Sequence, residues 1–289
     1  MGAKTKIDWC DASWNPITGC LHGCRYCYAR GIATRFSGHL MELEGYMETN
    51  DSPLSLKQTK LHVLKKPQRD DKGKIMPYPF GFEPTFHMYR EDIPAKWNKP
   101  KTIFVCSMAD LFGEWVPEEW IQDVFAACEA APQHTYLFLT KNPRRLQAMY
   151  NARIIKEWNE EHPNKPHPQT EEYAKYTPLP EHDNWWWGST VTDADGRRFQ
   201  GDILDHTFIS IEPLMEYLDA GLGSFGDAEW IIIGAETGNR KHKVIPKKAW
   251  VDNIVEAAGI TKAAVFMKES LRDIMGPDFV QEFPWEGEP

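Results

Sequence analysis

Residues 13–30 read SWNPITGCLHGCRYCYAR, and this stretch lays out the first unit of the fold. The run Ser13–Thr18 predicts a short strand, and a helix is expected over Ala29–Phe36. Between them lies a compact loop whose cysteines have the spacing C-x3-C-x2-C. A strand that leads through a loop into a helix is one βα unit of a parallel sheet. The chain is therefore expected to open with a βα unit whose loop carries Cys20, Cys24 and Cys27.

The cysteine spacing predicts a [4Fe–4S] cluster. Such clusters are normally held by four cysteine thiolates, so a loop with three leaves one iron open to an exogenous ligand. The alternative is a zinc site, because His22 lies among the cysteines and mixed sets of Cys and His bind zinc. Structural zinc sites usually combine two ligand pairs across a longer loop, and no second pair follows here. Cys10, Cys106 and Cys128 are scattered, and the last two are expected to be small buried apolar side chains.

Short β-branched and aromatic runs alternate with helical stretches along the chain. This alternation, over 289 residues, predicts an α/β fold that is a TIM-like (βα) barrel, full or partial, with six to eight βα units. Besides Ala29–Phe36, helices are expected at Glu118–Ala131, Pro143–Tyr150 and Lys247–Ala258. The expected strands are Ser13–Thr18, Thr85–Tyr89, Thr102–Ser107, Thr135–Thr140, Trp186–Val191, Thr207–Ile211, Trp230–Gly234 and Ala264–Lys268.

Two stretches, residues 38–82 and 151–183, interrupt the alternation and are interpreted as insertions in a single domain that spans residues 1–275. The first directly follows the helix expected after the cysteine loop. It lies either on the face of the barrel that normally contributes to stability or over the catalytic mouth as a lid. The acidic tail, residues 276–289, is expected to be loosely held. No leader sequence and no long apolar run is recognised, which predicts a cytoplasmic protein without a membrane span.

Residues that directly follow barrel strands converge on the catalytic face, and here they are polar. Glu212 and Glu236 follow runs too apolar to be surface strands, so each carboxylate needs a buried partner or a ligand. Glu212 is expected to contact a cofactor, and both are candidate catalytic groups together with Lys141 and Arg90. Further cofactor contacts are expected from four residues that could equally cap the following helices, namely Ser107, Asp110, Thr140 and Ser189.

The net charge of −9 argues against a protein that coats nucleic acid by bulk electrostatics. Residues 57–74, however, carry a local charge of +5, which leaves −14 on the rest of the chain, and are either a solvated loop or a phosphate-contacting surface. A positive barrel mouth would favour an anionic substrate such as a phosphate, unless neighbouring carboxylates neutralise it. The basic residues expected at the mouth are Arg90, Lys141, Arg144, Arg145, Arg197, Arg198, Arg240, Lys241 and Lys243.

Three consecutive tryptophans, Trp185, Trp186 and Trp187, open the fifth expected strand. Side chains along a strand alternate between its two faces, so the three rings cannot share one side. Most of their area is expected in the core, and one ring could stack on adenine or on a substrate base.

The cysteine motif resembles that of the radical S-adenosylmethionine superfamily, in which an aromatic residue precedes the last cysteine, as Tyr26 does here. Nearly the whole chain is similar to a radical S-adenosylmethionine family of phages and bacteria that is related to spore photoproduct lyase. One departure is VFMKES (265–270), where the family has a Lys-Gln-Trp-Gly ending. The similar segments are SWNPITGC (13–20), CRYCYA (24–29), FVCSMADLF (104–112), LFLTKNPRR (137–145), WWGSTV (186–191), ISIEPL (209–214) and WIIIGAETG (230–238).

The resemblance implies an activity. In the superfamily the open iron binds S-adenosylmethionine, one electron cleaves it, and the resulting 5′-deoxyadenosyl radical abstracts hydrogen from a substrate. For this chain it implies Cys20, Cys24 and Cys27 as cluster ligands, Tyr26 beside the cofactor, and an electron donor such as flavodoxin or ferredoxin. Relatives act on thymine in DNA, so an isomerase- or lyase-type reaction on a nucleotide or DNA base is expected, in a bacterial or phage-infected cell. A base in duplex DNA would have to be flipped into the barrel.

Two alternatives remain open. The same chemistry could act on a small metabolite or peptide, and neutralising residues 57–74 would then leave substrate binding unchanged. The chain could also be a non-catalytic, metal-binding interaction module in which the cysteines only staple a loop. Metal analysis separates this second alternative, because zinc without sulfide would support the module.

Overall fold

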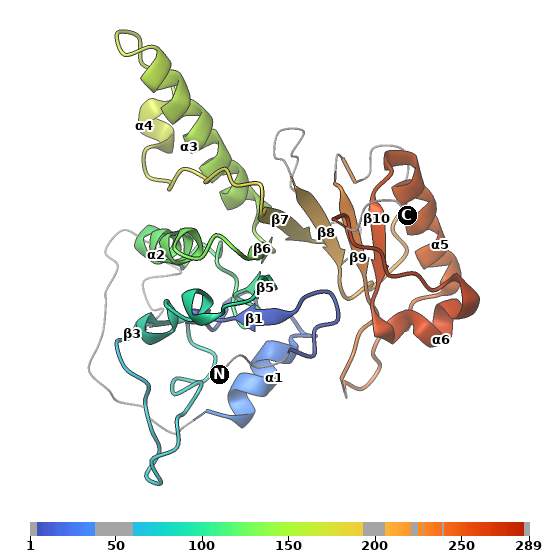
Figure 1. The fold of residues 1–289 in the computed structure, drawn as a ribbon. Coiled ribbons are helices and arrows are strands. Elements are labelled where there is room, and N and C mark those ends of the chain that lie inside the picture. The colour runs from blue at the N-terminus through green and yellow to red at the C-terminus, as the bar shows by residue number, and fades with distance from the viewer. Residues whose placement is uncertain are drawn as a thin grey trace.

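The computed structural model of the chain has an α/β fold built on one large, curled parallel sheet (Figure 1). No helix in its described part is both long and apolar enough to cross a bilayer. The structure describes residues 5–37, 60–192, 206–220, 225–226, 228–238 and 240–285.

Each neighbouring pair of strands in the large sheet is parallel. Its edge strands β1 and β10 are not paired with each other in the described part of the chain, so the sheet is a partial barrel. Among the described residues seven strands form it, in the order β1 (Ala12–Trp14), β5 (Thr102–Val105), β6 (Thr135–Thr140), β7 (Trp185–Thr190), β8 (Thr207–Ile211), β9 (Trp230–Ile233) and β10 (Ala264–Met267).

Helices cover the outer face of this sheet in two groups. Side chains of α2 and α3 share a buried cluster with β5, β6 and β7, and those of α5 and α6 share another with β8, β9 and β10. These strands are buried on both faces, which explains their continuous apolar sequences. The helices are α1 (Tyr28–Arg35), α2 (Glu118–Glu129), α3 (Pro143–Glu161), α4 (Thr170–Tyr173), α5 (Lys248–Thr261) and α6 (Arg272–Met275), with short 3-10 turns at Met88–Arg90, Pro94–Lys96, Glu269–Leu271 and Gly276–Asp278.

The inner face of the sheet is lined by large apolar side chains. Trp186, Phe208 and Trp230 form one buried cluster there, and Trp9 packs over it from the N-terminal segment. Trp185 and Trp187 belong instead to the outer cluster with α2. The three tryptophans therefore alternate between the faces, as the strand period requires.

One expected barrel strand belongs to a different sheet. Residues Thr85–His87 form β4, which pairs antiparallel with β2 (Ile17–Thr18) and parallel with β3 (His62–Leu64) in a small sheet of its own. The expected strand Ser13–Thr18 is accordingly split between the two sheets. Local apolar patterning predicts a strand at each place, but it does not reveal which sheet receives it.

Two further expectations about the chain need correction. Helix α3 continues to Glu161, so the segment interpreted as an insertion from residue 151 begins inside a helix, and α3 and α4 together project away from the sheet (Figure 1). The tail is not loosely held over residues 276–285. Met267 N donates to Val280 O at 2.9 Å, and Phe283 and Trp285 pack on Trp230. The apolar residues of the tail thus close the barrel floor on the β10 side.

Candidate functional site

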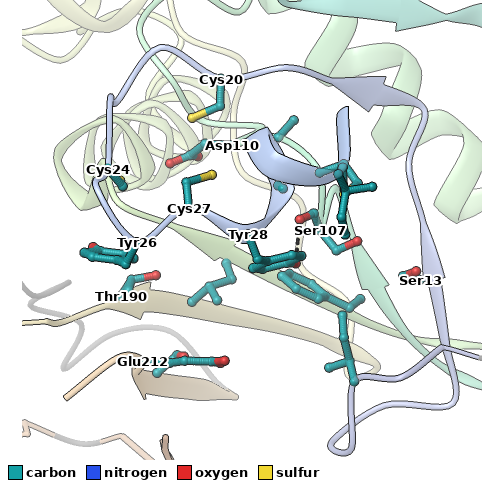
Figure 2. Close-up of a pocket in the computed structure, with 18 of the residues that line it drawn as sticks. Ser13, Cys20, Cys24, Tyr26, Cys27, Tyr28, Ser107, Asp110, Thr190 and Glu212 are labelled. Atoms are coloured by element: carbon teal, nitrogen blue, oxygen red, sulfur yellow. Dashed lines mark hydrogen bonds between the residues drawn. The ribbon is translucent and has the colours of Figure 1, made fainter. Parts of the chain in front are cut away.

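A cavity of about 600 Å³ lies over the carboxyl ends of the main-sheet strands. Its size is typical of a small-molecule or cofactor site. The loop with Cys20, Cys24 and Cys27 forms one wall, and strand ends from β5 to β10 form the others. Figure 2 shows the cysteines around their loop, with Tyr26 and Tyr28 below them and Thr190 and Glu212 beyond.

The cysteine loop is fixed at both ends by the backbone. Gly19 N donates to Met108 O at 2.9 Å, and Gly19 bridges to Ala109, which ties the loop to the end of β5. At the other end Cys27 is the N-cap of α1, and its Sγ accepts a hydrogen bond from Arg30 N at 3.3 Å. The positive end of the α1 dipole therefore faces this sulfur.

A buried carboxylate connects the middle of the loop to the sheet. Asp110 accepts hydrogen bonds from His22 Nε2 at 2.7 Å, Thr140 Oγ1 at 2.7 Å and the backbone N of Lys141 at 2.8 Å. Burial acts to raise the pKa of Asp110, but these hydrogen bonds and the nearby His22 outweigh it and hold the pKa below its ordinary value. Asp110 also accepts from Phe112 N, so its lone pairs are filled and it positions the loop rather than offering a free ligand.

The donor set fits an iron–sulfur cluster. Three thiols from one short loop line a common cavity, with open space beside them. Burial raises the pKa of the Cys20 thiol to about 12, so its thiolate form needs the compensating charge of a bound metal. Within the described ranges no three His, Cys, Asp or Glu side chains converge as ligands of a single ion. A [4Fe–4S] cluster does not need three ligands around one ion, because each cysteine binds a different iron atom of the cluster.

The aromatic residue before the last cysteine lies beside a lysine. Lys141 Nζ lies 5.4 Å from the centre of the Tyr26 ring, within the range of a cation–π contact, and both residues line the cavity. Burial lowers the pKa of the Lys141 ammonium, although Cys24, Asp110 and Glu212 act in the opposite direction. Lys141 thus places a positive charge between the cysteine loop and the far wall of the cavity.

The two predicted glutamates line the far wall, and each has a basic partner. Glu212 accepts a hydrogen bond from Lys268 Nζ, and Glu236 accepts from Arg240 Nη2 at 2.6 Å. Hydrogen bonds from Arg240 lower the pKa of Glu236, and burial only partly offsets this. Glu236 is buried and Glu212 is half-buried, and in both cases the protein itself supplies the partner that such a carboxylate needs.

The predicted polar contacts on β5 and β6 lie at the cavity, but the protein itself uses part of their hydrogen-bonding capacity. Ser107 Oγ donates to Asn15 Oδ1 at 3.2 Å, and its carbonyl accepts from Tyr28 Oη at 2.8 Å (Figure 2). Thr140 Oγ1 donates to Asp110 and accepts from Asn142 N at the start of α3. Thr140 therefore braces the turn that leads into α3 as well as the site.

Arg90 and Ser189 are not among the residues that line the cavity. Because β4 lies in the small sheet, Arg90 follows a strand that does not lead to the mouth, and it donates instead to the carbonyls of Asn15 and Pro77, both at 3.0 Å. Ser189 is buried, and its register next to Thr190 puts it on the other face of β7. We therefore withdraw Arg90 as a catalytic group and Ser189 as a cofactor contact.

The expected positive mouth is largely neutralised or displaced. Arg145 is buried against Glu118 at 2.6 Å, and Arg240 is paired with Glu236, so of the expected basic residues that the structure describes Lys141 alone lines the cavity. Arg197 and Arg198 lie outside the described residues. The neutralisation alternative fits these contacts better than a binding site for a free phosphate inside the cavity.

Sequence reasoning missed several residues of the cavity. Asn15 accepts from Met108 N at 2.8 Å and joins β1 to β5, and Trp9 forms part of the floor. Ser210, by contrast, stands near the end of a predicted strand, where polar residues are expected at the mouth, and it lines the cavity on β8, two residues before Glu212. Tyr78 and Phe82 come from the described half of the first insertion, which therefore reaches the mouth.

Gly19 and Gly23 provide a matched pair of substitutions in the loop. Both have positive φ, 89° and 69°, but a Cβ on Gly19 would lie 2.2 Å from Glu83 O, whereas one on Gly23 would meet nothing within 4 Å. We expect Gly19→Ala to destabilise the protein by about 2–5 kcal/mol and Gly23→Ala by about 1–2 kcal/mol. Urea unfolding measures both, and equal losses would contradict this close packing of the loop on Glu83.

Comparison with known proteins identifies the family of the chain. No curated protein and no solved structure is significantly similar to the chain. The family described as "Protein of unknown function (DUF5131)" matches residues 4–271, which includes the cysteine loop and every strand of the partial barrel. The chain therefore belongs to the DUF5131 family.

Proposed function

We propose that this protein is a radical S-adenosylmethionine enzyme that acts on a nucleotide or on a base in DNA. The observation that carries the proposal is the placement of Cys20, Cys24 and Cys27 on one wall of a 600 Å³ cavity at the carboxyl ends of the sheet. A reduced [4Fe–4S] cluster at these cysteines would supply electrons to cleave S-adenosylmethionine and so generate a radical.

The chain's own residues have four tasks in this proposal. Asp110 holds the cysteine loop against β5 and β6 through His22. Tyr26 and Lys141 form the surface between the loop and the far wall, where the carboxylate of a bound cofactor would meet a positive charge. Glu212 offers an acceptor on the far wall, shared with Lys268. Tyr78 and Phe82 line the cavity and would limit the access of water to a bound cofactor.

The proposed function is tested by product formation. The anaerobically reconstituted, dithionite-reduced protein is incubated with S-adenosylmethionine, with and without thymidine-containing DNA, and 5′-deoxyadenosine is measured. We expect slow formation without DNA and faster formation with it. No product from an intact, reduced cluster would contradict the enzyme assignment, and stimulation by small metabolites or peptides instead of DNA would favour the alternative substrate class.

A basic hairpin close in sequence to the cavity wall supports a nucleic-acid substrate. Arg69 bridges to Ile75, Asp70 Oδ1 accepts from the backbone N of Lys74 at 2.8 Å, and the chain leads directly to Tyr78 in the cavity wall. The hairpin exposes a group of cations that could follow a phosphate backbone to the mouth, and they are Lys65, Lys66, Arg69, Lys72 and Lys74.

Neutralising this hairpin should weaken DNA binding. We expect the triple variant Lys66→Gln, Lys72→Gln, Lys74→Gln to lower the slope of log K against log salt by about 2–3 for single-stranded or duplex DNA. The control is Lys156→Gln, Lys165→Gln, Lys175→Gln on the projecting α3–α4 arm, which removes the same charge. Fluorescence anisotropy over a salt series gives both slopes, and equal slopes would exclude the hairpin as the contact.

A further inference from the structure

The loop that follows β9 carries a second group of cations. Residues 240–248 contain five Lys or Arg and no Asp or Glu. Arg240 pairs with Glu236, and Lys248 pairs with Asp252 at 2.6 Å. The other cations of the loop are exposed and form no ion pair with a described carboxylate, and they are Lys241, Lys243 and Lys247. The loop therefore presents a positive surface on a protein whose net charge is −9.

Glu236 holds this loop against the cavity. Glu236 lines the cavity, and its carboxylate accepts hydrogen bonds from Arg240 Nη2 at 2.6 Å and from the backbone N of Val244 at 3.0 Å. These two partners lie on either side of a turn at residues 241–242. Pro246 is buried and precedes the start of α5. The loop is therefore fixed at both ends, next to the wall of the cavity.

Ile245 is the exposed apolar side chain of the loop. It is 68% exposed, the largest exposed fraction among the large apolar side chains that the structure describes. Its neighbours in the chain are Val244, which is hydrogen-bonded to Glu236, and the buried Pro246, so its backbone is held in place. A β-branched side chain is also stiff about its first torsion angle. A rigid apolar side chain among cations is the combination with which proteins enter the base stack of DNA.

We propose that Ile245 is a wedge that enters the base stack of duplex DNA when a base turns into the cavity. This inference rests on the proposed function in taking a base in DNA as the substrate. A base in a duplex reaches a cavity only by leaving the stack, and the gap that it leaves is unfavourable. Ile245 fills the gap with apolar surface, while Lys241 and Lys243 bind the phosphates beside it.

The test measures unstacking directly. A duplex that contains 2-aminopurine next to a thymine is titrated with the reconstituted protein in the absence of S-adenosylmethionine, because this adenine analogue fluoresces more strongly when it is unstacked. Wild type is compared with Ile245→Ala, Ile245→Leu and Ile260→Ala. Ile260→Ala is the matched control, because this isoleucine is also exposed, at 55%, but lies on α5 and does not line the cavity.

We expect wild type, Ile245→Leu and Ile260→Ala to raise the fluorescence of the bound duplex, and Ile245→Ala to raise it by about half as much or less. Ile245→Ala should also bind the duplex about 3- to 10-fold more weakly than wild type, because the apolar contact with the bases is lost. Removal of a largely exposed side chain should leave the thermal midpoint unchanged, which separates lost unstacking from lost folding.

The cations of the loop should act on affinity alone. We expect the double variant Lys241→Gln, Lys243→Gln to lower the slope of log K against log salt by about 2, because it removes two phosphate contacts. The fluorescence of the duplex at saturation should stay at the wild-type level, because Ile245 is intact. A wild-type salt slope in the double variant would remove these lysines from the contact.

Two outcomes would overturn the wedge. One is wild-type fluorescence with Ile245→Ala, or an equal loss of fluorescence with Ile260→Ala. The other is Ile245-dependent binding to anionic phospholipid vesicles without unstacking of DNA, which would assign the loop to a membrane surface. Failure of the proposed function is distinguishable, because wild type would then form no 5′-deoxyadenosine, whereas the fluorescence of the duplex is measured without S-adenosylmethionine.

Discussion

Cys27→Ala and Cys24→Ala should each reduce 5′-deoxyadenosine formation to the level of a protein-free control. Each removes one of three thiols that line the same cavity, and no described neighbour is placed to replace it, since His22 is held by Asp110 and Cys106 is buried. A cluster held by two cysteines loses iron readily, so the iron and sulfide contents should fall together with the activity.

Two comparisons separate lost chemistry from lost folding. Cys27 also caps α1, and its loss costs about 1 kcal/mol of helix stability, whereas Cys24 has no capping role. Cys128→Ala is the control, because this thiol is buried in α2 away from the cavity. It should keep iron, sulfide and activity. Full activity in Cys24→Ala and Cys27→Ala would remove the cysteines from the mechanism.

Asp110→Ala should detach the cysteine loop from the sheet. The carboxylate accepts four hydrogen bonds, and its removal leaves the hydroxyl proton of Thr140 and two backbone N–H groups without an acceptor. Breaking such a buried network should cost about 3 kcal/mol or more in the free energy of unfolding. We also expect faster loss of iron to a chelator, because His22 no longer holds the loop in place.

The matched control is Asp123→Ala, which removes the same charge from an exposed position on α2 and should change the unfolding free energy by less than about 0.5 kcal/mol. Asp110→Asn keeps the shape but replaces one acceptor by a donor, so it should fall between the two. Urea unfolding and chelator kinetics measure both effects. Wild-type iron retention in Asp110→Ala would show that the loop does not depend on this contact.

The sequence was most informative where strands are buried on both faces. The runs Thr135–Thr140 and Thr207–Ile211 match β6 and β8, because continuous apolar sequence with β-branched residues has no other stable place in an α/β fold. The three cysteines were singled out as candidate ligands from their spacing alone. Their common position on the cavity wall follows from the βα unit that carries them.

The remaining features of the fold and of the site depend on tertiary contacts that local sequence patterns do not reveal. The segment at Thr85–His87 satisfies the pattern of a barrel strand, but pairing with β2 and β3 takes it into another sheet and removes Arg90 from the mouth. Arg145 follows β6 as expected, yet its side chain turns into the protein toward Glu118. That Trp9 Nε1 and Ser210 Oγ form no hydrogen bond with the described residues could not be predicted, since hydrogen bonding is a property of the packed structure.

We propose that Cys20, Cys24 and Cys27 hold a [4Fe–4S] cluster with one iron open to S-adenosylmethionine. Electron paramagnetic resonance of the anaerobically reconstituted, reduced protein, recorded with and without S-adenosylmethionine, tests it most directly. We predict the signal of a reduced [4Fe–4S] cluster whose g-values shift when S-adenosylmethionine is added, and no such signal in Cys27→Ala. A protein that retains zinc and no sulfide, or a cluster signal that S-adenosylmethionine leaves unchanged, would contradict the account.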